Sequence, residues 1–210
     1  MIYDNYIELQ KLLDCNKPQA DPKYALEESF FIRIHHIHEI NFAQILEDLK
    51  SFDSNLTTSS LREKKDQLNR ILACWKLNIN TLKLLEFLDK EDFLGFRSSL
   101  TGISGMQSSQ YMFWIDVFYK TMDRYKNGGL KHSSIFSILQ SIHTCHNDWL
   151  VAHEEVILHF IQNDHGTGDT EGFRYMQEQR NHYDTLWNEI STTLNKICLL
   201  YTSDAADDPA

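Results

Sequence analysis

No apolar stretch in this sequence reaches the roughly 20 residues that a helix needs to cross a bilayer. The opening MIYDNYIELQ also lacks the basic residues and the apolar run of a secretory signal. Lysine and arginine number 20 against 30 aspartates and glutamates, and no basic cluster interrupts the formal charge of −10. A surface that follows nucleic-acid phosphates is therefore not expected. We predict a soluble, cytoplasmic protein that binds neither membranes nor nucleic acid.

Cysteine is sparse as well. The four cysteines show neither the close pairing of a zinc site nor the density of a disulfide scaffold: Cys15, Cys74, Cys145 and Cys198. We expect reduced thiols that pack as small apolar groups. A chain of 210 residues without an obvious linker is long enough for one domain with a sizeable core. We assign that domain to residues 1–200.

The end of the sequence differs from the rest. An amphipathic pattern runs as far as Leu200 and stops at YTSDAADDPA, which contributes three of the ten net negative charges. LLYTSDAADDPA also resembles translated adapter sequence at the end of a fragmentary reading frame. We therefore expect residues 201–210 to be a non-native tail and leave them out of the fold.

Apolar residues recur at helical spacing along most of the chain, and no stretch fits a strand better. Turn-forming residues separate the helical segments at CNKPQADP, LTGISG, KNGGLKHSS and NDHGTGDTEG. Ser60 and Glu63 have the spacing of a capping box at the start of a helix. These patterns predict an all-α fold, an antiparallel bundle of about six helices.

Histidines are concentrated in two of the expected helices. FFIRIHHIHEI places Phe31, His35 and Glu39 four residues apart, so that they share one inward face. A second group lies on a later helix: His143, His146, His153 and His159. Bundle cores hold metals and haems with such side chains. Hydrogen-bonded polar packing in the core is the alternative.

Two kinds of metal site are compatible with a bundle. A di-iron carboxylate site uses Glu-x-x-His motifs, whereas Glu155 and His159 are four residues apart. A haem needs one neutral imidazole in apolar surroundings, and WLVAHEEVILHF provides this at His153. The residues by themselves leave polar packing, a non-haem metal site and a haem site open.

Five separated segments together resemble the tryptophan 2,3-dioxygenase family of all-helical haem enzymes. They are YDNYIELQKLLDCNKP, LEESFFIRIHHIHEI, FLGFRSSLTGISGMQSSQY, WLVAHEEVILHFIQNDHGTG and YMQEQRNHYDTLW, in the order of the family. The third is the most specific, because it is similar to a long Phe-Arg-x-x-Leu-x-x-x-Ser-Gly-Phe-Gln-Ser-x-Gln motif. The resemblance implies a bundle that encloses a haem pocket.

The resemblance also implies roles around the cofactor. His153 would be the proximal ligand of the iron of haem b, with Trp149 one turn earlier against the same region. Ser104 and Gly105 would lie close to the haem or substrate. His35 would be the distal, catalytic histidine near the indole N–H. His36 and His38 are expected on other faces of the helix, at the surface or in interhelix hydrogen bonds.

Further residues are implied to bind the substrate, L-tryptophan, which O₂ would convert to N-formylkynurenine. Phe31 and Phe93 would contact its ring, Arg97 would take its carboxylate by two parallel hydrogen bonds, and Thr167 would contact its ammonium. The family's shared sites between subunits imply a homo-oligomer, a tetramer. The residues that would reach into a neighbouring pocket are Tyr3, Tyr6 and Ile7.

The sequence departs from the family in several places, among them Asn41, where a tryptophan is usual, and His36, where a glutamine is usual. The segment between residues 111 and 148 is shorter than usual, and Asp169 and Glu171 add charge to the loop that contains Thr167. Three alternatives therefore remain beside the dioxygenase: a haem-dependent hydroxylase of aromatic amino acids, a haem-binding bundle without catalysis, and a non-haem metal bundle.

Overall fold

The computed structural model describes residues 2–100, 107–127, 132–160 and 172–204. These residues contain no strand, so the all-α prediction is confirmed. The elements in chain order are α1 (Tyr3–Tyr6), α2 (Leu9–Asp14), η1 (Pro22–Tyr24), α3 (Ala25–Ser54), α4 (Leu61–Lys83), η2 (Leu84–Phe87), α5 (Lys90–Arg97), η3 (Ser98–Leu100), α6 (Ser109–Asn127), α7 (Ser133–Phe160) and α8 (Gly172–Asp204). Five of the α-helices are long, and α1, α2 and α5 are short.

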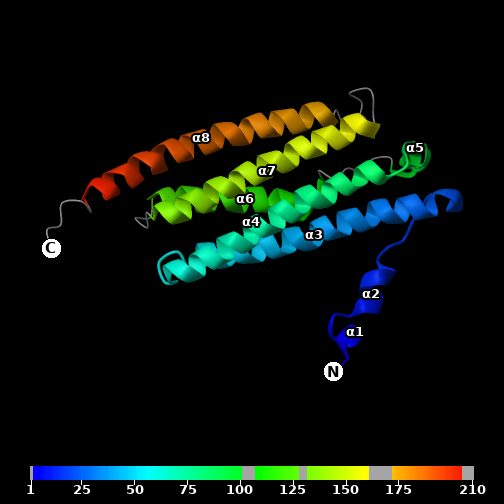
Figure 1. Ribbon diagram of the computed structural model, residues 1–210, viewed down its shortest axis with the longest axis horizontal. Coiled ribbons are helices and arrows are strands. Elements are labelled where there is room, and N and C mark those ends of the chain that lie inside the picture. Colours follow the sequence, from blue (N-terminus) through cyan, green and yellow to red (C-terminus); the bar gives the residue numbers. More distant parts are fainter. Residues whose placement is uncertain (1, 101–106, 128–131, 161–171, 205–210) are drawn as a thin grey trace.

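The five long helices form a closed ring of neighbours. α3 packs on α4, α4 on α7, α7 on α8, α8 on α6, and α6 back on α3. In Figure 1 successive long helices along the chain run in alternating directions. The start of α3 therefore lies at the same end of the bundle as the end of α7. The short α5 contacts both helices there.

Helix boundaries follow local chemistry. At the start of α4 the backbone N–H of Glu63 donates to Oγ of Ser60, 3.2 Å away, and the N–H of Ser60 donates back to the Glu63 carboxylate at 2.8 Å. The predicted capping box is thus confirmed. CNKPQADP does separate α2 from α3, and KNGGLKHSS contains the end of α6 at Asn127 and the start of α7 at Ser133. The breaks predicted at LTGISG and NDHGTGDTEG fall largely outside the described residues. α8 continues to Asp204, four residues into the segment expected to be a tail.

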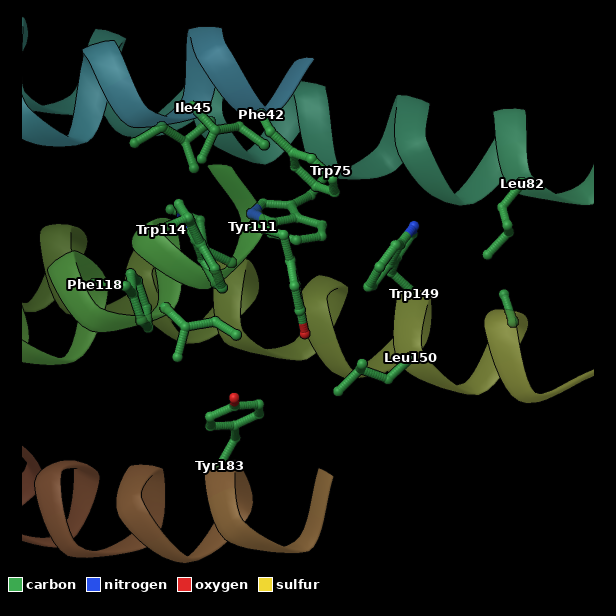
Figure 2. Packing of buried hydrophobic residues seen from close by; sticks show 14 of the residues in the cluster. Phe42, Ile45, Trp75, Leu82, Tyr111, Trp114, Phe118, Trp149, Leu150 and Tyr183 are labelled. Carbon is green, nitrogen blue, oxygen red and sulfur yellow. The ribbon is translucent and has the colours of Figure 1, made fainter. Parts of the chain in front are cut away.

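Aromatic side chains fill the centre of the ring. Trp75 of α4 meets Trp114 of α6 at 4.7 Å between ring centroids, and both are fully buried. Trp149 of α7 lies 5.7 Å from Trp75. Figure 2 shows how these rings and Tyr111 converge from three helices. This core holds the walls of the candidate site in place.

The buried stripe of α3 contains polar as well as apolar residues. Ile37 is 38% exposed, whereas His38 and Asn41 are buried. The Asn41 amide donates to Oδ1 of Asn78 on α4 at 2.7 Å, and Nε2 of His38 lies 3.1 Å from the Asn78 carbonyl oxygen. Because buried polar groups need partners, these contacts fix α3 against α4 at this level.

The N-terminal arm, residues 2–14, differs from the bundle in having no buried residue. Its two short helices project away from α3 (Figure 1). Within the described part of the chain, no helix combines the length and apolarity needed to cross a membrane.

Candidate functional site

A cavity of about 360 Å³ lies at the end of the bundle where α3 begins and α7 ends. This volume is in the range of about 300–1,000 Å³ typical of small-molecule sites. Its lining is mostly apolar but contains four histidines. The bordering residues are Gln19, Glu28, Phe31, Ile32, Ile34, His35, His36, His38, Glu39, Phe42, Leu82, Ser99, Leu100, Ser108, Trp149 and His153. Four residues singled out from the sequence, Phe31, His35, Trp149 and His153, thus meet at one cavity.

His35 is held by its own helix. Its Nδ1 atom lies 2.8 Å from the carbonyl oxygen of Phe31, one turn earlier. A carbonyl oxygen only accepts, so Nδ1 carries the proton. Burial lowers the pKa of His35, which keeps the ring neutral and leaves Nε2 as a hydrogen-bond acceptor. The Phe31 ring packs against His35, with 4.2 Å between centroids.

His153 borders the cavity from α7. Its Nδ1 atom is buried and has no hydrogen-bond partner among the described residues. Burial, with smaller contributions from the neighbouring rings of His35 and His38, lowers its pKa to about 4. The imidazole is therefore neutral at physiological pH, which is the form that binds a metal. Trp149 lies one turn earlier, with 5.5 Å between ring centroids.

Phe93 and Arg97 both lie on α5. Phe93 is buried and its ring packs on Phe31 at 5.9 Å and on Phe160 at 4.5 Å. Arg97 is the last residue of α5, two positions before Ser99. Neither borders the cavity among the described residues, although Ser99 and Leu100 do. The sequence had placed Phe93 and Arg97 at the substrate itself.

The polar wall is wider than the sequence indicated. His36 and His38, expected on other faces of the helix, also border the cavity, because the cavity extends around α3. The expected interhelix hydrogen bond of His38 is present, to the Asn78 carbonyl. Glu39 also borders the cavity and accepts from the Gln110 amide of α6 at 2.8 Å.

One functional group was missed altogether. The Glu28 carboxylate is buried and accepts from the backbone N–H groups of Gln19 and Ala20, at 2.8 and 2.9 Å. It thereby holds the loop between α2 and η1 against the cavity. Only the burial of an acidic residue in the first turn of α3 marks this role, and that burial cannot be read from the sequence.

Several residues singled out from the sequence cannot be placed in the cavity. Ser104, Gly105 and Thr167 lie outside the described residues. Tyr3, Tyr6 and Ile7 lie on the N-terminal arm and are 70%, 73% and 37% exposed. In the part of the chain that is described, no group of three or more His, Cys, Asp or Glu side chains is arranged to hold a metal ion.

A family model for tryptophan 2,3-dioxygenase matches residues 1–116. This is more than half of the 210 residues. The chain belongs to the tryptophan 2,3-dioxygenase family. Tryptophan 2,3-dioxygenase of Mus musculus is 31% identical over an alignment 119 residues long, and the match covers 53% of this chain and 29% of the mouse protein. The chain therefore spans less than a third of the length of the curated relative that it matches.

The part matched by the tryptophan 2,3-dioxygenase model contains Phe31, His35, Phe93 and Arg97 but ends before Trp149 and His153. The two halves of the candidate site are thus supported differently. The residues on α3 are supported both by the match to the family model and by their position at the cavity. The α7 wall has the geometry and the local motif WLVAHEEVILHF.

Proposed function

We propose that this chain forms the haem pocket of a cytoplasmic, tryptophan 2,3-dioxygenase-like enzyme. The reaction would open the indole ring of L-tryptophan with O₂ and give N-formylkynurenine. The observation that carries the proposal is the single cavity bordered by Phe31 and His35 from α3 and by Trp149 and His153 from α7. Membership of the family supports the same reaction.

The residues present fit a haem. A proximal ligand must be a neutral imidazole with a nitrogen free to bind, and His153 has a lowered pKa and a buried Nδ1 atom without a partner among the described residues. Trp149, Phe42 and Leu82 provide apolar surface in the same cavity. We assign the iron ligand to His153 and the flanking ring to Trp149. Bound haem would supply the oxygen binding and the redox chemistry.

The protein's own part is to orient the substrate. Nε2 of His35 would accept a hydrogen bond from the indole N–H, because Nδ1 already donates to Phe31. The Phe31 ring would pack on the indole, and Phe93 supports Phe31 from behind. Holding the ring in one orientation lowers the entropic part of the barrier.

The amino-acid end of the substrate would be bound by Arg97 and Thr167. A guanidinium can take a carboxylate through two parallel hydrogen bonds. Arg97 ends α5 just before Ser99 and Leu100, which do border the cavity. Ser104 and Gly105 follow within a few residues and would complete this side of the pocket.

The N-terminal arm supports a shared site in a homo-oligomer, and we propose a tetramer. Tyr3 and Tyr6 are largely exposed on an arm that buries none of its own residues. Apolar surface of this kind is stabilised when a second copy covers it. We propose that Tyr3, Tyr6 and Ile7 line the pocket of a neighbouring copy.

The proposal is tested by adding hemin to the purified chain and recording its absorption spectrum. We expect a Soret band in the wild type and its loss or shift in His153→Ala. His159→Ala is the matched control, because His159 lies on the same helix and is exposed. A spectrum that His153→Ala leaves unchanged would remove the ligand assignment.

Product mass then identifies the reaction. With tryptophan, O₂ and a reductant, incorporation of both oxygen atoms is expected for ring opening. Incorporation of a single oxygen atom would identify a hydroxylase on the same scaffold. Bound haem with no turnover would identify a haem-binding bundle without catalysis.

A further inference from the structure

A series of aromatic rings leads from the cavity through the core. The ring of Trp149, which borders the cavity, lies 5.1 Å from that of Tyr111. The Tyr111 hydroxyl lies 2.9 Å from Nε2 of His146. The His146 ring is 5.4 Å from Tyr183, which stacks on Tyr119 at 5.6 Å and 17°. All these centroid distances fall in the range of about 4.5–7 Å for rings in contact. Figure 2 shows Trp149, Tyr111 and Tyr183 along this line.

The far end of the series reaches the surface. Tyr119 and Tyr183 line an open groove of about 780 Å³ between α6 and α8, together with Lys120, Gln179 and His182. The series therefore connects two hollows, the histidine-lined cavity and this groove. Both are wide enough for a small oxidant or reductant.

The buried indoles of the core do not stabilise a tryptophan radical. An indole that loses an electron becomes acidic and must release its N–H proton to be stabilised. The Nε1 atoms of Trp75, Trp114 and Trp149 are buried and have no hydrogen-bond partner among the described residues. An oxidised indole here would keep its positive charge in a medium of low dielectric, which is costly.

Tyr111 differs because its hydroxyl has a base beside it. Tyr111 and His146 are both buried, at 1% and 0% exposure. Burial lowers the pKa of His146 to about 3, so its ring is neutral and one nitrogen carries a lone pair. The same burial disfavours the imidazolium once formed, so the proton returns when an electron does.

We propose that Tyr111, with His146 as proton acceptor, is a redox station between the cavity and the groove. One electron leaves the Tyr111 phenol, through Trp149 to a one-electron oxidant in the cavity such as an oxidised haem, or through Tyr183 and Tyr119 to an oxidant at the groove. The phenolic O–H bond breaks and the proton forms an N–H bond at Nε2 of His146. The products are a neutral tyrosyl radical, an imidazolium and an oxidant reduced by one electron.

The groove end can be tested without any cofactor. The full chain is oxidised with photogenerated tris(bipyridine)ruthenium(III) and frozen for electron paramagnetic resonance. We expect a long-lived tyrosyl radical that is lost in Tyr111→Phe and retained in Tyr6→Phe, a control on the exposed arm. A long-lived signal that Tyr111→Phe leaves unchanged would overturn the proposal.

A second measurement keeps the test independent of the folding of that variant. Circular dichroism first shows whether Tyr111→Phe has the helical content of the wild type. If it does not, high-field spectra of the wild type decide. A hydrogen-bonded tyrosyl g-tensor with coupling to an exchangeable proton is expected. A radical without that proton would contradict a station at Tyr111.

The cavity end is tested with zinc protoporphyrin, photo-oxidised in place by an external electron acceptor. We expect the porphyrin cation to be re-reduced as the tyrosyl radical appears, and more slowly in Trp149→Leu. Bound porphyrin that gives no tyrosyl radical would overturn the cavity branch. Failure of the porphyrin to bind would count against the proposed function instead, and the ruthenium experiment would still decide the station.

Discussion

Arg70 of α4 holds the carboxylate of Asp48 on α3 with two of its nitrogens. Nε lies 3.0 Å from Oδ2, and Nη2 contacts Oδ1. Asp48 is 3% exposed, whereas the Arg70 side chain is 59% exposed. A buried carboxylate is thus neutralised by a cation that reaches it from solvent.

Arg70→Ala is expected to destabilise the bundle, because it leaves the Asp48 carboxylate buried without its cation. Charge-assisted hydrogen bonds contribute about 1.5–3 kcal/mol, and solvent around Arg70 places the expected loss at the lower end. Urea unfolding measures the free energy of unfolding directly. Arg62→Ala is the control, because its pair with Asp66 is exposed and 3.8 Å long. Equal effects of the two substitutions would contradict the role of the buried pair.

Acid is expected to destabilise the protein partly through His146. Its pKa in the folded chain is about 3, below the value near 6.5 in the unfolded chain, so the unfolded state binds more protons between these values. The stabilisation that the buried, neutral His146 gives the folded state is therefore fully present above pH 6.5 and is lost as the pH falls toward 3. It amounts to roughly 2 kcal/mol between pH 7 and pH 5.

Unfolding measured from pH 7 to pH 5 should therefore depend less on pH in His146→Gln than in the wild type. Thr144→Ala, at an exposed position on the same helix, should keep the wild-type slope. Identical slopes in all three proteins would show that the imidazole at position 146 is not buried in its neutral form.

Leu150→Ala should lower the free energy of unfolding by about 2–5 kcal/mol, since Leu150 is fully buried and truncation leaves a cavity. Leu158 lies on the same helix but is 51% exposed, so Leu158→Ala should change stability far less. Thermal and urea unfolding of both variants check the packing of α7. A small loss in Leu150→Ala would mean that α7 is rotated about its axis.

Binding of 1-methyltryptophan tests the hydrogen bond proposed for His35. Without an indole N–H this ligand cannot donate to Nε2, and losing one hydrogen bond of about 1 kcal/mol weakens binding about fivefold. In His35→Phe the two ligands should bind with similar affinity, because the acceptor is gone. Titrating the haem-loaded wild type and the haem-loaded His35→Phe variant with each ligand gives the ratio of the affinities for tryptophan and 1-methyltryptophan in both proteins. If His35→Phe still bound tryptophan more tightly than 1-methyltryptophan, the indole N–H would have an acceptor other than His35.

Helical spacing was sufficient to predict how Phe31 and His35 lie relative to each other. Both belong to one helix, so their spacing fixes their shared face. The Ser60–Glu63 capping box was predictable for the same reason, since all its atoms belong to adjacent turns. Local geometry of this kind is encoded in local sequence.

Contacts between distant segments were not predictable in this way. Asn78 stands 40 residues from His38, and His146 stands 35 from Tyr111. Their pairing depends on how the helices are rotated and shifted against each other. His36 is an example, because the cavity extends around α3 as far as this residue. The extent of the cavity depends on how the neighbouring helices pack, which local sequence does not determine.

α3 and α7, which carry His35 and His153, both pack along α4, and α4 borders the cavity through Leu82. α4 lies against both helices and thus sets the distance between His35 and His153. Bulkier or smaller side chains at its buried positions, Trp75 and Leu82 among them, would widen or narrow the gap without touching either imidazole. Substitutions on α4, which supplies none of the proposed catalytic or ligand-binding residues, would thus change the size of the ligand that the cavity accepts.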